Sequence, residues 1–329
     1  VAVAGAFAFN FSEITLLAHI SDASTVSATN VTLLAIDKAG LFRTDAFGIS
    51  AAYSEALGGT DDNVLGIAVG VAVAVNGVRN RVKSYIDDSL VTASNDVSLK
   101  SVVKSEYEAL ALGIAGSLAQ SNSQSGAITA AGSAAVNEID NQIKARIVDS
   151  NGDSLPGVVA GGSLSVVALD SMTVSADAGG FSIAVAKSNG ANNGSAGAMA
   201  AGFSVAVNEV GQGDGHEILA RIDNSNVQAD TGIDITAHST ADIDSLAMGG
   251  ALAAGVAQSG TGAAIAAGGA GSYNTVDQTI KAAVENGSVV DVTGGNVNII
   301  ATDDVKIVAD AGGVSIAIAK AGQSGNAGA

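Results

Sequence analysis

The residues with the most potential for chemistry in this chain are its histidines. His19, His216 and His238 lie far apart in the sequence, and none has a partner at metal-ligand spacing. No Ser-His-Asp or Cys-His arrangement is indicated, and no pair of carboxylates recurs in a way that would mark a cleft. We therefore expect surface or turn histidines, no catalytic residues and no enzymatic activity.

Acidic turns are the second candidate for chemistry, because Ca²⁺ binds carboxylate and carbonyl oxygens. Four aspartates in turn-like segments are candidate calcium ligands: Asp61, Asp62, Asp153 and Asp214. The segment 211–217, GQGDGHE, resembles in part a Gly-rich phosphate loop and in part a calcium-binding repeat, but it matches neither pattern in full. Solvated turns that keep the protein soluble explain these residues as well, so we expect no cofactor, with Ca²⁺ as the alternative.

One asparagine recurs through the chain, each time at the end of a run of small apolar residues. The runs are AGAFAFN, GVAVAVN, GSAAVN, GFSVAVN and GAGSYN, and the spacings between the asparagines are 66, 61, 71 and 66 residues. Such a period is typical of stacked repeats. If one repeat is one rung, the amides form a structural ladder along the axis. Its members are Asn10, Asn76, Asn137, Asn208 and Asn274.

The residues after each asparagine repeat as well. Small or apolar side chains alternate up to an Ile or Val ten residues later, and a turn former follows two residues beyond it. The fourth repeat reaches this pattern four residues late, which indicates a short insertion within 211–216. Asp and Asn tolerate left-handed backbone geometry, so we expect turns at Asp22, Asp88, Asp149, Asn224 and Asn286.

A second alternating block recurs and leads each time into a Gly-containing stretch, as at 164–172 before AGGFSIAVA. Alternation with period two indicates strands, and no stretch has helical periodicity. We predict an all-β fold without helices, a parallel β-solenoid with repeats of about 66 residues. The favoured geometry is one long rung per repeat, and the alternative is three coils of about 22 residues.

The repeats divide the chain into one continuous array. Residues 1–10 end a preceding repeat, and 275–329 are an incomplete one, which suggests a slice of a longer array. The repeats between them are 11–76, 77–137, 138–208 and 209–274.

The two faces of the predicted strands change character along each repeat. In 66–75 and 196–207 both faces are small and apolar, whereas beyond the asparagine one face becomes charged. The charged residues are Lys83, Lys144, Arg146, Arg221 and Lys281. Two apolar faces need a second layer, which we expect to be an internal layer of the solenoid, with lateral assembly between chains as the alternative.

Composition narrows the function classes. The net charge is −18, and the 14 basic residues form no stripe in the sequence, which argues against nucleic acid as a partner. The longest apolar stretch, 64–75, is too short and too rich in Gly for a membrane-spanning helix. The acidic balance and the absence of Cys fit a secreted or surface protein.

The pattern AVAVN..V.N.V.A.I..S.V.A...V.V.A, at 71–103 and 133–168, resembles the repeat regions of giant bacterial surface and secreted adhesins, the filamentous-haemagglutinin-like large exoproteins. The resemblance covers essentially the whole chain, although the period here is longer. It implies a parallel β-solenoid, an extracellular or cell-surface location and a role in adhesion, matrix or cell contact. It carries no catalytic residues.

We therefore expect a structural segment of an extracellular fibre or stalk that acts by rigid β-stacking and by lateral assembly. Its expected partners are further repeats of the same chain or identical chains, and cell-surface or matrix polysaccharide. The alternatives from other classes are a carbohydrate-binding or calcium-binding solenoid module and a polysaccharide-degrading solenoid enzyme.

Overall fold

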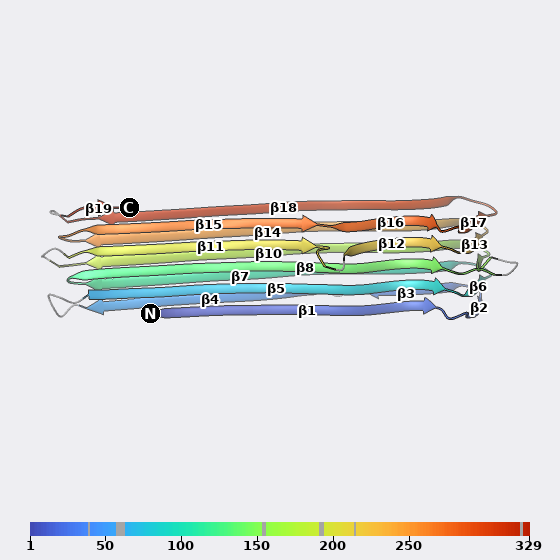
Figure 1. Ribbon diagram of the computed structural model, residues 1–329, viewed down its shortest axis with the longest axis horizontal. Helices are drawn as coiled ribbons and strands as arrows, with labels where there is room; N and C mark the ends of the chain where they lie inside the picture. The colour runs from blue at the N-terminus through green and yellow to red at the C-terminus, as the bar shows by residue number, and fades with distance from the viewer. Residues whose placement is uncertain (39, 57–62, 153–155, 191–193, 214, 323–324) are drawn as a thin grey trace.

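The chain folds as a parallel β-solenoid in the computed structural model, which describes residues 1–38, 40–56, 63–152, 156–190, 194–213, 215–322 and 325–329. Each rung contributes a strand to three sheets, which we name A, B and C (Figure 1). The described residues form strands and turns without a helix. Accordingly, no helix in this part of the chain is long and apolar enough to span a membrane.

The strands of each sheet are stacked in chain order, except that some rungs contribute two strands. Sheet A contains β1 (Ala2–Ile20), β5 (Asn63–Asp87), β8 (Gln124–Val148), β11 (Ala196–Val210), β12 (His216–Asp223), β15 (Gly262–Val276), β16 (Gln278–Glu285) and β19 (Ala327–Gly328). Sheet B contains β2 (Thr25–Ala28), β6 (Leu90–Ala93), β9 (Val158–Ala160), β13 (Asn226–Ala229) and β17 (Val289–Val292). Sheet C contains β3 (Val31–Asp37), β4 (Leu41–Ala56), β7 (Val97–Ser121), β10 (Ser163–Ser188), β14 (Gly232–Ala257) and β18 (Val297–Lys320).

Neighbouring rungs pair in parallel, with equivalent residues of the repeats side by side. Asn76 pairs with Asn137, and Asn137 with Asn208. One repeat is therefore one long rung, and the alternative of three coils of about 22 residues is wrong. The spacing between repeats varies because turns and insertions differ in length, while the strands keep their register.

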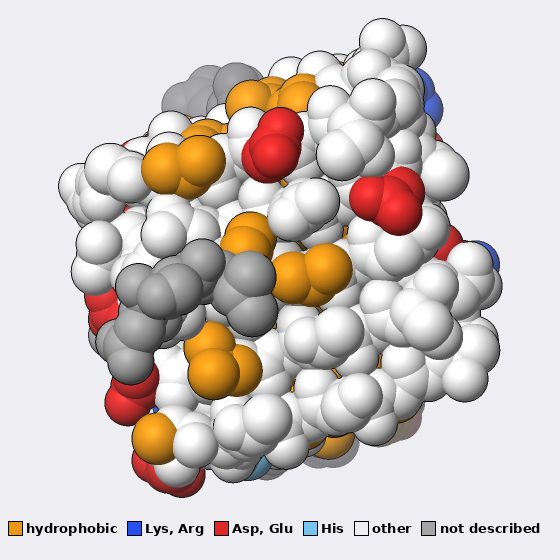
Figure 2. All heavy atoms as spheres, turned by 90° about the vertical axis from the view of Figure 1, so that its right-hand side faces the viewer, with side chains coloured by type: hydrophobic (Ala, Val, Ile, Leu, Met, Phe, Trp, Pro, Cys, Tyr) orange, Lys and Arg blue, Asp and Glu red, His pale blue; other side chains and the backbone are white. Residues whose placement is uncertain are grey.

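The solenoid is a flat slab whose longest dimension lies along the strands (Figure 1). Strands β5, β7 and β8 each contain 25 residues, which at 3.3 Å per residue is about 80 Å. Five rungs at the usual strand spacing rise about 24 Å. Figure 2 looks along the strands onto the end that carries sheet B, where hydrophobic and acidic side chains are scattered among polar atoms.

The interior is widest beside sheet B and thinnest at the opposite end of the rung. Beside sheet B, three sheets enclose a core of Ile, Leu and Val that includes Ile143, Leu164 and Ile233. Farther along the strands, the buried residues are almost all Ala. Since only sheets A and C line that part, they approach each other closely, and large side chains do not fit.

A row of glycines marks the closest approach of sheets A and C. A Cβ atom at Gly180 would lie 2.1 Å from the carbonyl oxygen of Phe203, and one at Gly202 would lie 2.0 Å from that of Gly250. Any side chain here would force the sheets apart. The row consists of Gly48, Gly113, Gly180, Gly249 and Gly313 in sheet C and of Gly70, Gly202 and Gly268 in sheet A. It explains the Gly in the repeated stretches after each alternating block.

The second apolar face of these strands is on the outside of the slab. Ile49 and Ile183 of sheet C expose 61% and 52% of their surface, and Phe7 and Phe203 of sheet A expose 66% and 52%. The expectation of an internal second layer is therefore wrong, because the coil folds no further layer over these residues. Both broad faces of the slab are apolar over this half of the rung.

Candidate functional site

The recurring asparagines lie in one column of sheet A and bond to one another along the axis. The Nδ2 atom of Asn76 donates to Oδ1 of Asn137 at 2.8 Å, and Asn137 donates in the same way to Asn208 at 2.8 Å. Asn208 continues the ladder to Asn274 at 2.9 Å. Asn10, in the first rung, is exposed and donates to the carbonyl oxygen of Arg43 at 2.7 Å.

Each amide also crosses the interior to sheet C. Asn137 Nδ2 donates to the carbonyl oxygen of Ser175 at 2.7 Å, and Asn208 Nδ2 donates to that of Asp244 at 2.7 Å. Because Asn76, Asn137 and Asn208 are fully buried, every hydrogen bond here replaces one that water would have supplied. An aspartate would lack both donors and carry charge, so the column requires an amide.

A second polar column, which the sequence did not indicate, lies between the same sheets nearer to sheet B. Asn80 Nδ2 donates to Asp37 Oδ2 at 2.9 Å in the second rung. His216 Nε2 and Asp170 Oδ2 lie 2.7 Å apart farther up the stack. The backbone NH of Asn141 donates to His216 Nδ1 at 3.2 Å, so Nδ1 is the acceptor and Nε2–H donates to Asp170.

His216 is therefore a buried bracing residue, and the expectation of a surface or turn histidine is wrong for it. His216 and Asp170 are each 1% exposed, so a substrate cannot reach them. His216 opens β12 directly after the predicted insertion, whose length of four residues follows from two register pairs: Val210 with Ile139, 71 apart, and Glu217 with Gln142, 75 apart.

The other two histidines lie on the outside of the slab. His19 is exposed and stacks on Tyr85, with ring centroids 4.9 Å apart. The half-buried His238 contacts Thr302 Oγ1 at 2.7 Å. For these two residues the outside position is confirmed.

The five predicted turn formers mark the corner between sheets A and B, and all of them have left-handed backbones. Their φ angles lie between 43° and 64°, which confirms the prediction: Asp22, Asp88, Asp149, Asn224 and Asn286. This geometry lets each long strand of sheet A turn sharply into a short strand of sheet B.

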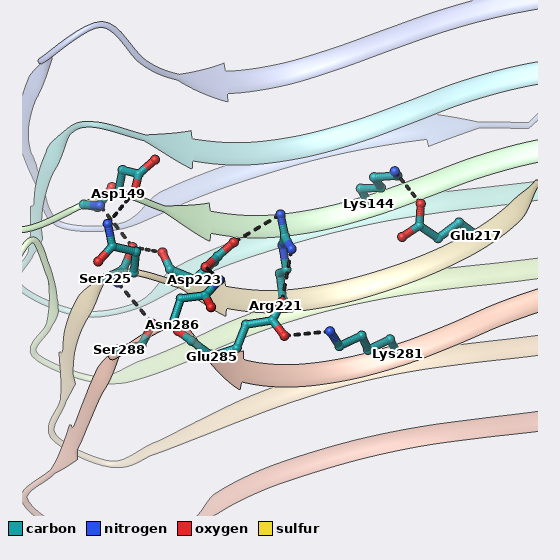
Figure 3. Close-up of polar contacts among 12 residues, drawn as sticks. Lys144, Asp149, Glu217, Arg221, Asp223, Ser225, Lys281, Glu285, Asn286 and Ser288 are labelled. Carbon is teal, nitrogen blue, oxygen red and sulfur yellow. Dashed lines mark hydrogen bonds and ion pairs between the residues drawn. The ribbon is translucent and has the colours of Figure 1, made fainter. Parts of the chain in front are cut away.

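A serine ladder that the sequence analysis missed runs beside this corner (Figure 3). The backbone NH of Ser89 donates to Ser150 Oγ at 3.4 Å, that of Ser150 to Ser225 Oγ at 3.0 Å, and that of Ser225 to Ser288 Oγ at 3.1 Å. The signal in the sequence is a serine one or two residues after each turn former.

The fold gathers half of the basic residues on the outer face of sheet A next to the corner. This basic strip consists of Arg79, Arg81, Lys83, Lys144, Arg146, Arg221 and Lys281, seven of the 14 basic residues. A stripe that the linear sequence lacks is thus created by stacking. Charged residues on this face were predicted, and five of these seven had been named.

Most of the basic strip is paired with carboxylates. Lys144 Nζ lies 2.5 Å from Glu217, and Glu285 accepts from Arg221 and Lys281 (Figure 3). Lys83 has no ion pair among the described residues, and burial together with Lys144, Arg146 and Arg81 lowers its pKa. Arg146 lies over the Tyr85 ring at 5.3 Å. The strip therefore presents cations and a stack of planar groups.

The four candidate calcium ligands, Asp61, Asp62, Asp153 and Asp214, lie outside the described residues. Within the described ranges, no group of three or more His, Cys, Asp or Glu side chains is arranged to hold a metal ion. Calcium binding therefore stays a prediction.

No protein-family model, curated protein or solved structure matches this chain. The resemblance to giant adhesins therefore rests on the repeated sequence pattern.

Proposed function

We propose that this chain is a structural segment of an extracellular fibre or stalk, in which rigid stacking of β-rungs carries load. The carrying observation is the in-register stack itself, where the three sheets and the asparagine ladder run through successive rungs. Its backbone hydrogen bonds point along the axis, so extension along the axis must break a whole rung at once.

The braces across the interior add to this proposal. The asparagine amides and the His216–Asp170 pair join sheets A and C, so the thin slab resists shear between its two layers as well as separation of its rungs. The acidic net charge and the adhesin-like pattern support a location outside the cell, at its surface or in the medium.

The test is immunogold electron microscopy of intact source cells with antibody against this chain. We expect gold on filaments or stalks outside the cell, and X-ray diffraction from oriented material should have an axial spacing of about 4.7–4.9 Å. Gold confined to the cell interior, or oriented material without this axial spacing, would contradict the proposal.

A second candidate function, binding of acidic polysaccharide, is favoured by the basic strip. Its uncompensated cation, Lys83, lies beside the stacked rings of His19 and Tyr85 and the Arg146 guanidinium. Polygalacturonate is a suitable probe, measured by calorimetry at low salt. Binding that is lost in Lys83→Ala with Arg146→Ala, but kept in the control Lys306→Ala on sheet C, would support this function, and no binding to the unaltered chain would exclude it for this probe.

A further inference from the structure

The outer face of sheet C carries an apolar surface four columns wide. The columns run through Phe47, Ile49, Ala51 and Tyr53 of β4 and their register partners in the four rungs above. All 20 positions, four in each of five rungs, are Gly, Ala, Val, Leu, Ile, Met, Phe or Tyr. We call this surface the C face.

The C face is flat because large side chains lie over glycines of the next rung. The Cδ1 atom of Phe181 would be 2.7 Å from a Cβ atom at Gly250, and Leu112 Cδ1 would be 2.8 Å from one at Gly179. Filling of a glycine gap by a neighbouring aromatic ring is a known device of sheet surfaces. Flat apolar sheets pack face to face at about 10 Å.

The C face has the size of a stable interface. Ten residues separate its two rims along each strand, about 33 Å, and five rungs rise about 24 Å, so its geometric area is about 800 Å². The largest apolar patch on a typical monomer is about 300–600 Å², whereas a standard protein interface buries about 800 Å² on each partner. This area matches what a stable pair of chains requires.

The two rims of the C face carry opposite charges in the same rungs. One rim has Asp177 in the third rung and Asp310 in the fifth, and the other has Lys187 and Lys320 in these rungs. The second and fourth rungs have uncharged residues at both rims. The pattern places attraction between two copies only where their strands run in opposite directions.

We propose that two copies of this chain pair through their C faces about a twofold axis parallel to the solenoid axis. This rotation brings Asp177 of one copy opposite Lys187 of the other, and Asp310 opposite Lys320. The like charges in the first rung, at Asp45 and Glu55, are relieved because Arg43 Nε lies 2.9 Å from Asp45.

Side-chain volumes fit the same rotation. With equivalent rungs level, Gly179 faces Val185, Met248 faces Ala254, and Gly312 faces Ile318, so small residues meet large ones. A twofold axis along the strands would instead place Asp177 against itself, which like-charge repulsion disfavours. Charge and volume thus select the same pairing.

This pairing extends the proposed function, since paired slabs would form a thicker fibre, but each can hold without the other. Chains that pair and yet never appear on extracellular filaments would contradict the fibre function alone. Chains on such filaments that do not pair would contradict the pairing alone.

The first measurement is sedimentation equilibrium of the chain and of two matched variants. Ile183→Asp places a carboxylate at the centre of the C face, and Ser171→Asp places one on the same strand and the same outer side, outside that face. We expect a dimer whose Kd rises at least tenfold in Ile183→Asp and stays within threefold in Ser171→Asp. Circular dichroism confirms that both variants are folded.

The second measurement uses the absence of cysteine in the chain. A mixture of Asp177→Cys and Lys187→Cys chains should form a mixed dimer with a short bifunctional thiol reagent, while each variant alone should not. Glu209→Cys, on the outer face of sheet A, is the control and should not cross-link.

Three results would overturn the pairing. The first is a chain that is monomeric at about 1 mM, where even a millimolar Kd would populate dimers. The second is self-linking of Asp177→Cys, which would indicate the other twofold axis. The third is binding of the monomer to phosphatidylcholine vesicles that Ile183→Asp abolishes, which would assign the C face to a lipid surface.

Discussion

Replacing one amide of the asparagine ladder should cost far more stability in the middle of the stack than at its exposed end. Asn137→Ala removes the bonds from Asn137 Nδ2 to Ser175 O, at 2.7 Å, and to Asn208 Oδ1, at 2.8 Å. It also removes the acceptor for Asn76 Nδ2.

The magnitude follows from the groups that are left without partners. Asn208 Oδ1 and Ser175 O would lose a donor in a dry interior, and each such loss costs about 1–3 kcal/mol. Asn76 keeps its bond to Glu108 O, at 2.7 Å, and so adds little. We expect Asn137→Ala to lower the free energy of unfolding by about 3–5 kcal/mol.

Asn10→Ala is the matched control, because Asn10 is exposed and has a single bond, to Arg43 O. Water replaces this bond, so the expected loss is about 0.5–1 kcal/mol. The assay is urea unfolding followed by circular dichroism, with the slopes of the two variants compared to establish that they unfold in the same way. Equal losses in the two variants would refute a ladder that stabilises the stack.

Three further perturbations test the interior. Gly180→Ala should lower the free energy of unfolding by about 1–3 kcal/mol, because its Cβ would meet a carbonyl oxygen of sheet A at 2.1 Å; in Gly116→Ala, with no atom within 4 Å of the new Cβ, a loss of the same size would argue against close contact of the sheets. Burial raises the pKa of Tyr107 to about 12 from its ordinary 10. The stabilisation by its neutral phenol is therefore complete below pH 10 and should fall by about 2–3 kcal/mol as the pH approaches 12; the same fall in Tyr107→Phe would assign it to other groups. His216→Ala leaves the buried Asp170 carboxylate unpaired and should cost about 3–5 kcal/mol in urea unfolding at pH 7, and a cost below 1 kcal/mol would contradict the proposed brace.

The stacked fold and its corners could be predicted from the sequence because they depend on local and periodic signals. Asp88 and Asp149 announce the corner by residue type, and Asn76 and Asn137 share a column because their repeats have matching strands. Neither inference needs knowledge of how the two broad sheets face each other.

The burial of His216 and the outward apolar face could not be predicted in the same way. Asp170 lies 46 residues away in another sheet, so no local spacing connects it with His216. Where Ala alternates with Val, Ile or Phe, both faces of a strand are apolar, and hydrophobicity alone does not tell the inside from the outside. The glycine row decides it, since only the smallest side chains fit between sheets A and C.

The flatness of the rungs gives the proposed fibre a preferred direction of bending. A beam about 80 Å wide and about 20 Å thick, two sheets with their side chains, is on the order of tenfold easier to flex across its thin dimension than across its width. Such a fibre behaves as a strap, which turns its broad side toward a shearing flow and stays straight edge-on. A second slab against the C face would double the thickness and remove much of that compliance.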